Sequence, residues 1–223
     1  MNPRLRGLYF VTPGNAAGRL EVVAAALRGG AGIVQYRDKS GDTDARRREA
    51  EAILTLCRRA GALCLVNDDV ELCKAIGADG VHLGESDAAI EAARVRLGTD
   101  WIIGASCYND LQHAHAAAAA GADYVAFGSV YPSTTKPQAR RANLDLLRAA
   151  RRELEVPICA IGGITPANAG PVIAAGADMV AVIQGITEAP NPEAAARALQ
   201  GLFCATYLDG GARCGAPPVG GTP

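Results

Sequence analysis

Short apolar and β-branched runs recur along the chain, and longer amphipathic segments separate them. Each run spans four or five residues, a length typical of a strand whose two faces are both buried in a parallel sheet. We therefore predict eight strands, at Leu8–Val11, Gly32–Tyr36, Leu63–Val66, Gly80–Leu83, Trp101–Ala105, Tyr124–Phe127, Ile158–Ile161 and Met179–Ile183.

Helix signals fill the gaps between these runs. Asp42 or Thr43 can cap a helix, and the apolar positions after it have the i, i+3, i+4, i+7 spacing of one helix face: Ala50, Ile53, Leu54 and Cys57. Gly61 is placed to end that helix. Further helix starts carry a capping residue, at Asn109-Asp110 before Leu111–Ala120, at Thr165-Pro166 and at Asn191-Pro192.

A repeated helix stop points to a repeated unit. The tripeptide Gly-Ala-Asp occurs at 77–79, 121–123 and 176–178, each time between a predicted helix and the next predicted strand. Eight βα units in a row favour a parallel sheet closed on itself, so the fold class is α/β, a single (β/α)8 TIM barrel over residues 1–208. A doubly wound open sheet is the alternative, but no G-x-G-x-x-G follows the first strand. Residues 209–223, rich in Gly and Pro, are expected to stay outside the packed barrel.

Composition narrows the classes of partner. The formal net charge of −1 offers no electrostatic footprint for nucleic acid or an anionic membrane. The longest charge-free run, 156–177, is interrupted by Pro and Gly, which indicates strand, loop and helix instead of a membrane span. The seven cysteines include no CxxC pair, and their apolar neighbours indicate buried thiols in a reducing cytoplasm. We expect a cytoplasmic protein that acts on small molecules, and a homodimer is kept as a hypothesis because the sequence leaves the oligomeric state open.

Polar residues collect where the predicted strands end, the edge at which TIM barrels carry their chemistry. After the second strand, alternation would send Gln35, Arg37 and Lys39 to one side, giving donors suited to a pyrophosphate and a polar heterocycle. An ordinary solvated strand end is the competing interpretation.

Acidic residues follow the third and fourth predicted strands. Asp68 and Asp69 come after one, and Asp87 comes after the other. Carboxylates on adjacent strands could converge on Mg²⁺, which takes one or two carboxylates plus water and phosphate oxygens. Each of these residues could instead cap the helix that follows it.

The remaining strand ends favour a phosphate site. Ser106 ends the fifth strand, and a hydroxyl-rich loop after the sixth strand contains Ser133, Thr135 and Lys136. The Gly162-Gly163 pair can bind an anion through backbone N–H groups, and Ile183 and Gln184 could complete the same pocket. The histidines are poor catalytic candidates, since His113 and His115 lie in an Ala-rich helix and His82 lies within a strand. No Ser-His-Asp order and no Cys flanked by a base is present, so acyl transfer is not expected.

With these residues in view, the sequence resembles the thiamine phosphate synthase (thiamine-phosphate pyrophosphorylase) family from Leu8 to about Leu202. Six motifs in order carry the resemblance: Gln35-Tyr36-Arg37-Asp38-Lys39, Asn67-Asp68-Asp69, the segment 77–84, Gly104-Ala105-Ser106-Cys107, the segment 127–136, and the segment 160–164.

The resemblance implies a transferase that condenses a hydroxymethylpyrimidine pyrophosphate with a thiazole phosphate, or its carboxylate, to give thiamine phosphate and pyrophosphate. It also implies roles for matching residues. Asp68 and Asp87 would hold Mg²⁺, and Arg37, Lys39 and Lys136 would stabilise the departing pyrophosphate. The pyrimidine pyrophosphate would bind to Gln35, Arg37, Lys39, Asn67 and Lys136, and the pyrophosphate or thiazole phosphate to Ser106, Ser133, Thr135, Gly163, Ile183 and Gln184. Breaking the C–O bond first would leave a pyrimidine-stabilised carbocation, so no nucleophilic side chain is required.

Three positions depart from the family pattern. Glu85 stands where Gln is common, Gln184 where a small hydroxyl residue is common, and Pro13 where an acidic residue is often found.

Two other functions stay open. A thiazole tautomerase would lack the acidic pair and need a proton-transfer residue near the sixth-strand loop, where position 129 is Ser. A non-catalytic phosphate-binding barrel would explain the Gly pair but not the two carboxylates.

Overall fold

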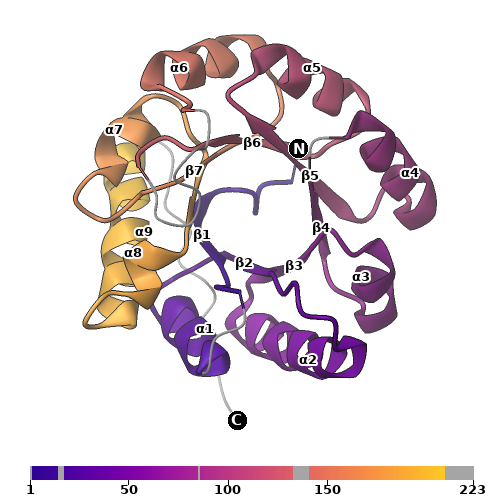
Figure 1. Cartoon of the computed structure of the whole chain (residues 1–223). Coiled ribbons are helices and arrows are strands. Elements are labelled where there is room, and N and C mark those ends of the chain that lie inside the picture. The colour runs from indigo at the N-terminus through magenta and orange to yellow at the C-terminus, as the bar shows by residue number, and fades with distance from the viewer. Residues whose placement is uncertain (1, 15–17, 85, 133–140, 209–223) are drawn as a thin grey trace.

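The structure of the chain is a computed structural model that describes residues 2–14, 18–84, 86–132 and 141–208, apart from the side chains of Asp87 and of residues 204–208. In these ranges eight strands form one closed parallel barrel, with helices around its outside (Figure 1). The strands are β1 Gly7–Val11, β2 Ile33–Tyr36, β3 Leu63–Asn67, β4 Gly80–Leu83, β5 Ile102–Tyr108, β6 Tyr124–Gly128, β7 Ile158–Ile161 and β8 Met179–Val182. The helices are α1 Arg19–Arg28, α2 Thr43–Ala60, α3 Val70–Ile76, α4 Asp87–Leu97, α5 Leu111–Ala119, α6 Leu144–Glu153, α7 Ala169–Ala174, α8 Gln184–Thr187 and α9 Pro192–Leu208.

Strand pairing follows chain order all the way round. Each strand pairs in parallel with the next, and β1 closes the barrel on β8, with Gly7 opposite Met179. The predicted TIM barrel is therefore confirmed, and each predicted strand is present. The main difference is β5, which continues to Tyr108, three residues beyond the predicted end, through an irregularity between Ser106 and Tyr108 in its pairing with β6.

The helix caps explain most of the helix boundaries. The Asp42 carboxylate accepts from the Ala45 N–H at 2.9 Å, and Gly61 ends α2 in the left-handed region with φ 67°. Asp110 caps α5 in the same way. The start predicted at Thr165-Pro166 is wrong, because α7 begins at Ala169. There the Asn168 side chain accepts from the Thr165 N–H and donates to the Gly163 carbonyl, which closes a turn ahead of the helix.

Two apolar layers make up the core. One lies between the sheet and the helices, and the other fills the inside of the barrel with residues that include Tyr9, Ile33, Leu65, Tyr124 and Met179. Leu5 belongs to the inner layer, and the segment that leads into β1 crosses the end of the barrel in Figure 1. The N-terminal end of the barrel is therefore packed.

Two further expectations from the sequence can be compared with the structure. The cysteines whose side chains are described, at positions 57, 64, 73, 107 and 159, are all free and buried, as predicted. Among the described residues, no helix is long and apolar enough to cross a membrane.

Candidate functional site

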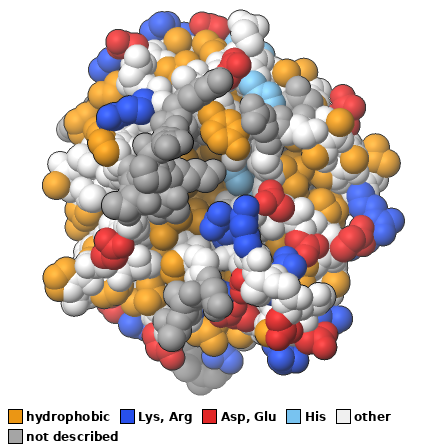
Figure 2. Space-filling model, viewed as in Figure 1, with side chains coloured by type: hydrophobic (Ala, Val, Ile, Leu, Met, Phe, Trp, Pro, Cys, Tyr) orange, Lys and Arg blue, Asp and Glu red, His pale blue; other side chains and the backbone are white. Residues whose placement is uncertain are grey.

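A cavity of about 420 Å³ opens at the carboxyl ends of the barrel strands. Every strand or the loop after it contributes to its wall, including Tyr9, Gln35, Asn67, His82, Ser106, Gly128, Ile161 and Val182. In the view of Figure 2, basic and acidic side chains gather beside a central hollow in which a histidine side chain is visible. The cavity thus lies where the sequence placed the chemistry.

A continuous chain of hydrogen bonds crosses the floor of this cavity from β2 to β5. The Gln35 amide nitrogen donates to the Tyr9 hydroxyl at 2.7 Å, and the Tyr9 and Tyr124 hydroxyl oxygens lie 2.8 Å apart. The Tyr124 hydroxyl lies 2.9 Å from His82 Nδ1, and His82 Nε2 lies 2.9 Å from Ser106 Oγ. We call these five residues the floor relay; each comes from a different strand and points inward.

The floor relay is electrically neutral near pH 7. Burial lowers the pKa of His82 to about 4, against the opposing effect of the Asp68 carboxylate. Burial also raises the pKa values of the Tyr9 and Tyr124 hydroxyls above their ordinary range. A floor with neutral donors and acceptors suits a polar but uncharged group more than a phosphate.

Arg37 provides a positive charge at the cavity wall above this floor. Its backbone is fixed by Thr12, whose hydroxyl oxygen accepts from the Arg37 N–H at 2.9 Å. Lys39 does not share this wall, because β2 ends at Tyr36 and strand alternation stops there. Lys39 instead lines a second hollow with residues that include Asn67 and Asp68. The expectation that 35, 37 and 39 share one side is therefore corrected, although Asn67 joins the two hollows.

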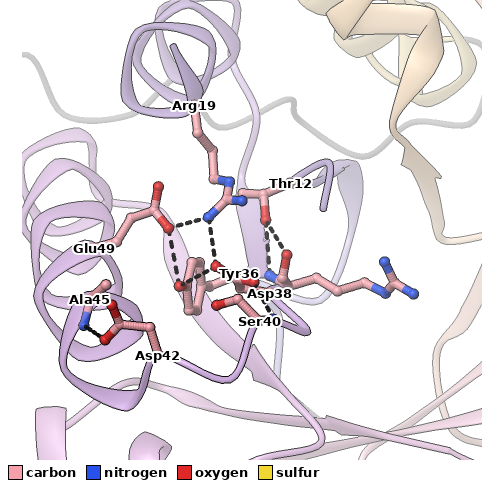
Figure 3. Close-up of polar contacts among 9 residues, drawn as sticks. Thr12, Arg19, Tyr36, Asp38, Ser40, Asp42, Ala45 and Glu49 are labelled. Atoms are coloured by element: carbon pink, nitrogen blue, oxygen red, sulfur yellow. Dashed lines mark hydrogen bonds and ion pairs between the residues drawn. The ribbon is translucent and has the colours of Figure 1, made fainter. Parts of the chain in front are cut away.

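A buried charge cluster lies behind the segment that carries Arg37 (Figure 3). The Arg19 guanidinium forms ion pairs with Asp38 and Glu49, and the Tyr36 hydroxyl donates to the Glu49 carboxylate at 3.1 Å. Burial acts to raise the pKa of Asp38, but hydrogen bonds from Ser40 and the Arg19 charge outweigh it and hold the pKa below its usual value. The cluster ties α1 and α2 to the residues after β2.

The acidic residues differ in their surroundings. Asp69 is the N-cap of α3, accepting from the Leu72 N–H at 2.8 Å, and it pairs with Arg46. Asp68 is exposed, has a φ of 62°, and accepts from the Asn67 amide at 2.7 Å. A non-glycine residue in this region is uncommon and often marks a functional position. Asp87 is the first residue of α4 and Ser86 is its N-cap residue; the Asp87 side chain lies outside the described part.

Another part of the cavity wall is formed by the turns after β7 and β8. Gly163, Ile183 and Gln184 all line the cavity there. Gly163 has a φ of 63°, and a Cβ atom added to it would lie 2.3 Å from the Pro132 carbonyl oxygen, so only glycine fits. The Gly pair does not lead directly into a helix, as the sequence suggested, because α7 starts later. The Gln184 amide donates to Glu188 at 2.7 Å, a contact that follows from the departure at position 184.

The structure therefore brings together Gln35, Arg37, Asn67, Ser106, Gly163, Ile183 and Gln184 around one cavity. Ser133, Thr135 and Lys136 lie outside the described residues. Sequence reasoning missed Tyr9 and His82 as wall residues, and it missed Tyr124 as the hydrogen-bond partner of both. A signal for His82 existed, since Val81 and Leu83 on either side belong to the layer under the helices, so alternation points His82 into the barrel. Among the described residues, no group of three or more His, Cys, Asp or Glu side chains could by itself hold a metal ion.

Comparison with known proteins gives consistent similarities. The family model described as thiamine monophosphate synthase matches residues 8–186. The thiamine-phosphate synthase of Thioalkalivibrio sulfidiphilus is 55% identical over 203 residues, covering 90% of this chain and 96% of that protein. The corresponding protein of Chromobacterium violaceum is 56% identical over 205 residues, covering 91% and 99%. Among solved structures, thiamine phosphate pyrophosphorylase from Pyrococcus furiosus superposes with a TM-score of 0.81 at 35% identity, covering 90% of this chain and 97% of that one.

Proposed function

The chain belongs to the thiamine monophosphate synthase family, and on that premise we propose how its cavity binds the two substrates and releases pyrophosphate. It is a transferase that condenses 4-amino-5-hydroxymethyl-2-methylpyrimidine pyrophosphate with thiazole phosphate to give thiamine phosphate and pyrophosphate. The tautomerase and the non-catalytic barrel are set aside, since relatives at 55% and 56% identity are synthases.

The pyrimidine ring takes the floor of the cavity in this proposal. The ring is neutral and carries both an amino donor and ring-nitrogen acceptors, which match the uncharged floor relay. Gln35 and Ser106 stand at the two ends of that relay, and both line the cavity. Ser106 is thereby assigned to the pyrimidine more than to a phosphate.

The pyrophosphate of the same substrate extends toward the cationic side of the mouth. Arg37 and Asn67 contact it there, and Lys39 adds charge from the segment after Arg37. The family resemblance gives the same role to Lys136, which lies outside the described residues. These cations stabilise the negative charge that builds on the leaving pyrophosphate as the C–O bond breaks. Arg37 is suited to this role because Thr12 holds its backbone, and the ion pair of Arg19 with Asp38 holds the segment that carries it.

Mg²⁺ fits the oxygen donors at this rim. Asp68 and Asp87 would hold it, and the exposed Asp68 carboxylate beside the Asn67 amide provides a hard oxygen ligand next to the pyrophosphate position. Two carboxylates are enough for Mg²⁺, which takes its other ligands from water and substrate phosphate. Bound there, the ion would neutralise charge on the leaving group.

The thiazole phosphate binds at the wall formed by the turns after β7 and β8. Backbone N–H groups around Gly163 and at Ile183 and Gln184 provide donors for its phosphate, with Ser133 and Thr135 as further contacts. The thiazole nitrogen then faces the carbon from which pyrophosphate departs. A side-chain nucleophile is not needed, and the cavity's Cys159 is a poor one because burial raises the pKa of its thiol and keeps it protonated.

The observation that carries this function is a cavity with a neutral floor, a cationic side and a glycine-lined side. The test supplies both substrates to the purified protein and follows thiamine phosphate and pyrophosphate, with Mg²⁺ and with EDTA. Stoichiometric, Mg²⁺-dependent release of both products is the expected result. Isomerisation of the thiazole without pyrophosphate release would contradict the assignment, and turnover unaffected by EDTA would contradict the metal role.

Cytoplasmic location and a homodimer remain hypotheses. The free, buried cysteines support a reducing compartment. Sedimentation of the purified protein would decide between monomer and dimer.

A further inference from the structure

We propose that His82 and Tyr124 are positioning residues that fix the direction of hydrogen bonding across the cavity floor, so that Ser106 donates to the pyrimidine while the Gln35 carbonyl accepts from it. The proposal rests on the proposed placement of the pyrimidine on this floor. Neither His82 nor Tyr124 is assigned contact with the reacting atoms; both act through Ser106.

Proton counting sets the direction at the first end of the relay. The Gln35 amide nitrogen can only donate, so the Tyr9 oxygen accepts from it at 2.7 Å. The Tyr9 hydroxyl then donates to the Tyr124 oxygen, which lies 2.8 Å away. If Tyr124 donated to Tyr9 instead, the Tyr9 proton would be left buried without an acceptor among the described residues, which costs free energy.

The same counting continues to the other end. Tyr124 donates to His82 Nδ1 at 2.9 Å, so Nδ1 accepts and the ring proton is on Nε2. Nε2–H then donates to Ser106 Oγ at 2.9 Å. The Ser106 hydroxyl proton and the Gln35 Oε1 atom are both left for a ligand. A donor and an acceptor at opposite ends match the ring nitrogen and the amino group of an aminopyrimidine.

Packing holds the middle of the relay in place. The Tyr124 ring stacks on His82 with centroids 5.7 Å apart, and it meets Tyr9 edge-on at 6.1 Å. Gly104 makes room for Tyr124, because a Cβ atom at that position would lie 2.0 Å from Tyr124 Cζ. The rings therefore cannot turn away, and the hydroxyl groups stay aimed along the relay.

One other arrangement with a singly protonated His82 also places one proton in each of the four contacts of the relay. It reverses each bond: the Gln35 amide is flipped, Tyr9 donates to Gln35 Oε1, and His82 carries its proton on Nδ1. Ser106 would then donate to His82 and accept from the ligand. The histidine tautomer distinguishes the two directions.

The first experiment is a matched set of kinetic variants. Ser106→Ala is expected to raise the KM for the pyrimidine pyrophosphate about tenfold, the scale of one hydrogen bond, with kcat nearly unchanged. His82→Asn keeps an acceptor near Nδ1 but loses the Nε2 donor, and it should raise the same KM to a similar extent. His82→Gln can place a donor near the Nε2 position and should recover most of that loss. The KM for the thiazole phosphate is the internal control and should not move.

The double variant Ser106→Ala with His82→Asn separates a relay from simple support. If His82 acts through Ser106, the double variant has the KM of Ser106→Ala alone. If the KM increases of the two single variants multiply instead, to about a hundredfold in the double variant, the proposal is overturned. Tyr124→Phe keeps the ring and its packing, so it provides the same cycle with Ser106→Ala if the His82 variants fold poorly.

The second experiment reads the tautomer directly. The chain has three histidines, so ¹⁵N-detected histidine spectra are simple, and loss of one pattern in His82→Gln assigns His82. We expect the Nε2–H pattern in the wild-type protein, and the Nδ1–H pattern would overturn the proposal. If the wild-type protein forms thiamine phosphate but these tests fail, only the positioning role of His82 and Tyr124 is rejected. If the wild-type protein forms no thiamine phosphate, the proposed function is rejected.

Discussion

Replacing Arg19 by methionine tests whether the buried charge cluster positions the cationic side of the cavity. Methionine fills a similar volume but removes the guanidinium between Asp38 and Glu49. Two carboxylates would then face each other with no cation between them. The segment after β2 would lose its tie to α1, and Arg37 would lose part of its support.

The magnitude follows from how deeply the three side chains are buried. The Arg19 side chain is 2% exposed and the Asp38 side chain 8%, whereas Glu49 is 27% exposed and can relax toward water. Removing one partner of a buried ion pair typically costs about 3–5 kcal/mol. Because Glu49 is less buried, we expect the lower end, a loss of about 3 kcal/mol in the free energy of unfolding.

Urea unfolding followed by circular dichroism measures this loss. Arg47→Met is the matched control, since its pair with Glu51 is exposed at 57% and 47%, and it should change the free energy by no more than about 0.5 kcal/mol. We also expect Arg19→Met to raise the KM for the pyrimidine pyrophosphate. A loss below about 1 kcal/mol, or one equal to that of the control, would refute the reasoning.

The pH dependence gives an independent check. The pKa of Asp38 is lowered in the folded protein, so its pairing stabilises the fold above the unfolded-state pKa of about 3.9. That stability is lost as the pH falls through the lower folded-state value. The difference between wild type and Arg19→Met should be largest near pH 7 and shrink as the pH falls, because the unpaired carboxylates of the variant take up protons before those of the wild type do. A difference that grows toward low pH would contradict the argument.

Other variants test the remaining walls. Arg37→Ala should raise the KM for the pyrimidine pyrophosphate about ten- to a hundredfold, with Arg37→Lys recovering only part, as steady-state kinetics would measure. Asp68→Asn should lower kcat and raise the Mg²⁺ concentration for half-maximal rate without changing the circular dichroism spectrum; an unchanged Mg²⁺ titration would count against the metal role. Gly163→Ala should cost about 1–3 kcal/mol in thermal or urea unfolding and raise the KM for the thiazole phosphate, because the residue has positive φ and its Cβ would lie 2.3 Å from a carbonyl oxygen. Wild-type values for Gly163→Ala would show that the wall can move.

Local signals carried the fold prediction. Short buried runs, side-chain caps such as Asp42 and left-handed stops such as Gly61 act within a few residues, so the sequence alone locates them. The start of α7 was misplaced because the turn before it depends on the Asn168 side chain reaching back to Gly163 and Thr165. A Thr-Pro pair in the sequence is compatible with a helix start and with a turn that precedes a helix, so it does not distinguish the two.

The site was predictable only as far as strand ends determine it. Closure of the barrel brings Gln35, Arg37 and Ser106 to one cavity, which follows from topology alone. The expectation that Lys39 lies on the same side as Gln35 and Arg37 was wrong, because β2 ends at Tyr36 and the alternation of side chains stops there. The contacts of Arg19 were beyond prediction, since its partners lie 19 and 30 residues away and meet it only when α1 packs beside α2.

The packed N-terminal end of the barrel affects how substrates enter the cavity and how products leave it. In the described part of the chain, Leu5 and the inner apolar layer fill that end, and the cavity opens at the carboxyl ends of the strands. In the binding mode proposed above, the pyrimidine lies deeper in the cavity than the thiazole phosphate. That arrangement predicts ordered binding, with the pyrimidine pyrophosphate entering first and the thiazole phosphate second, and both products leaving through the same opening.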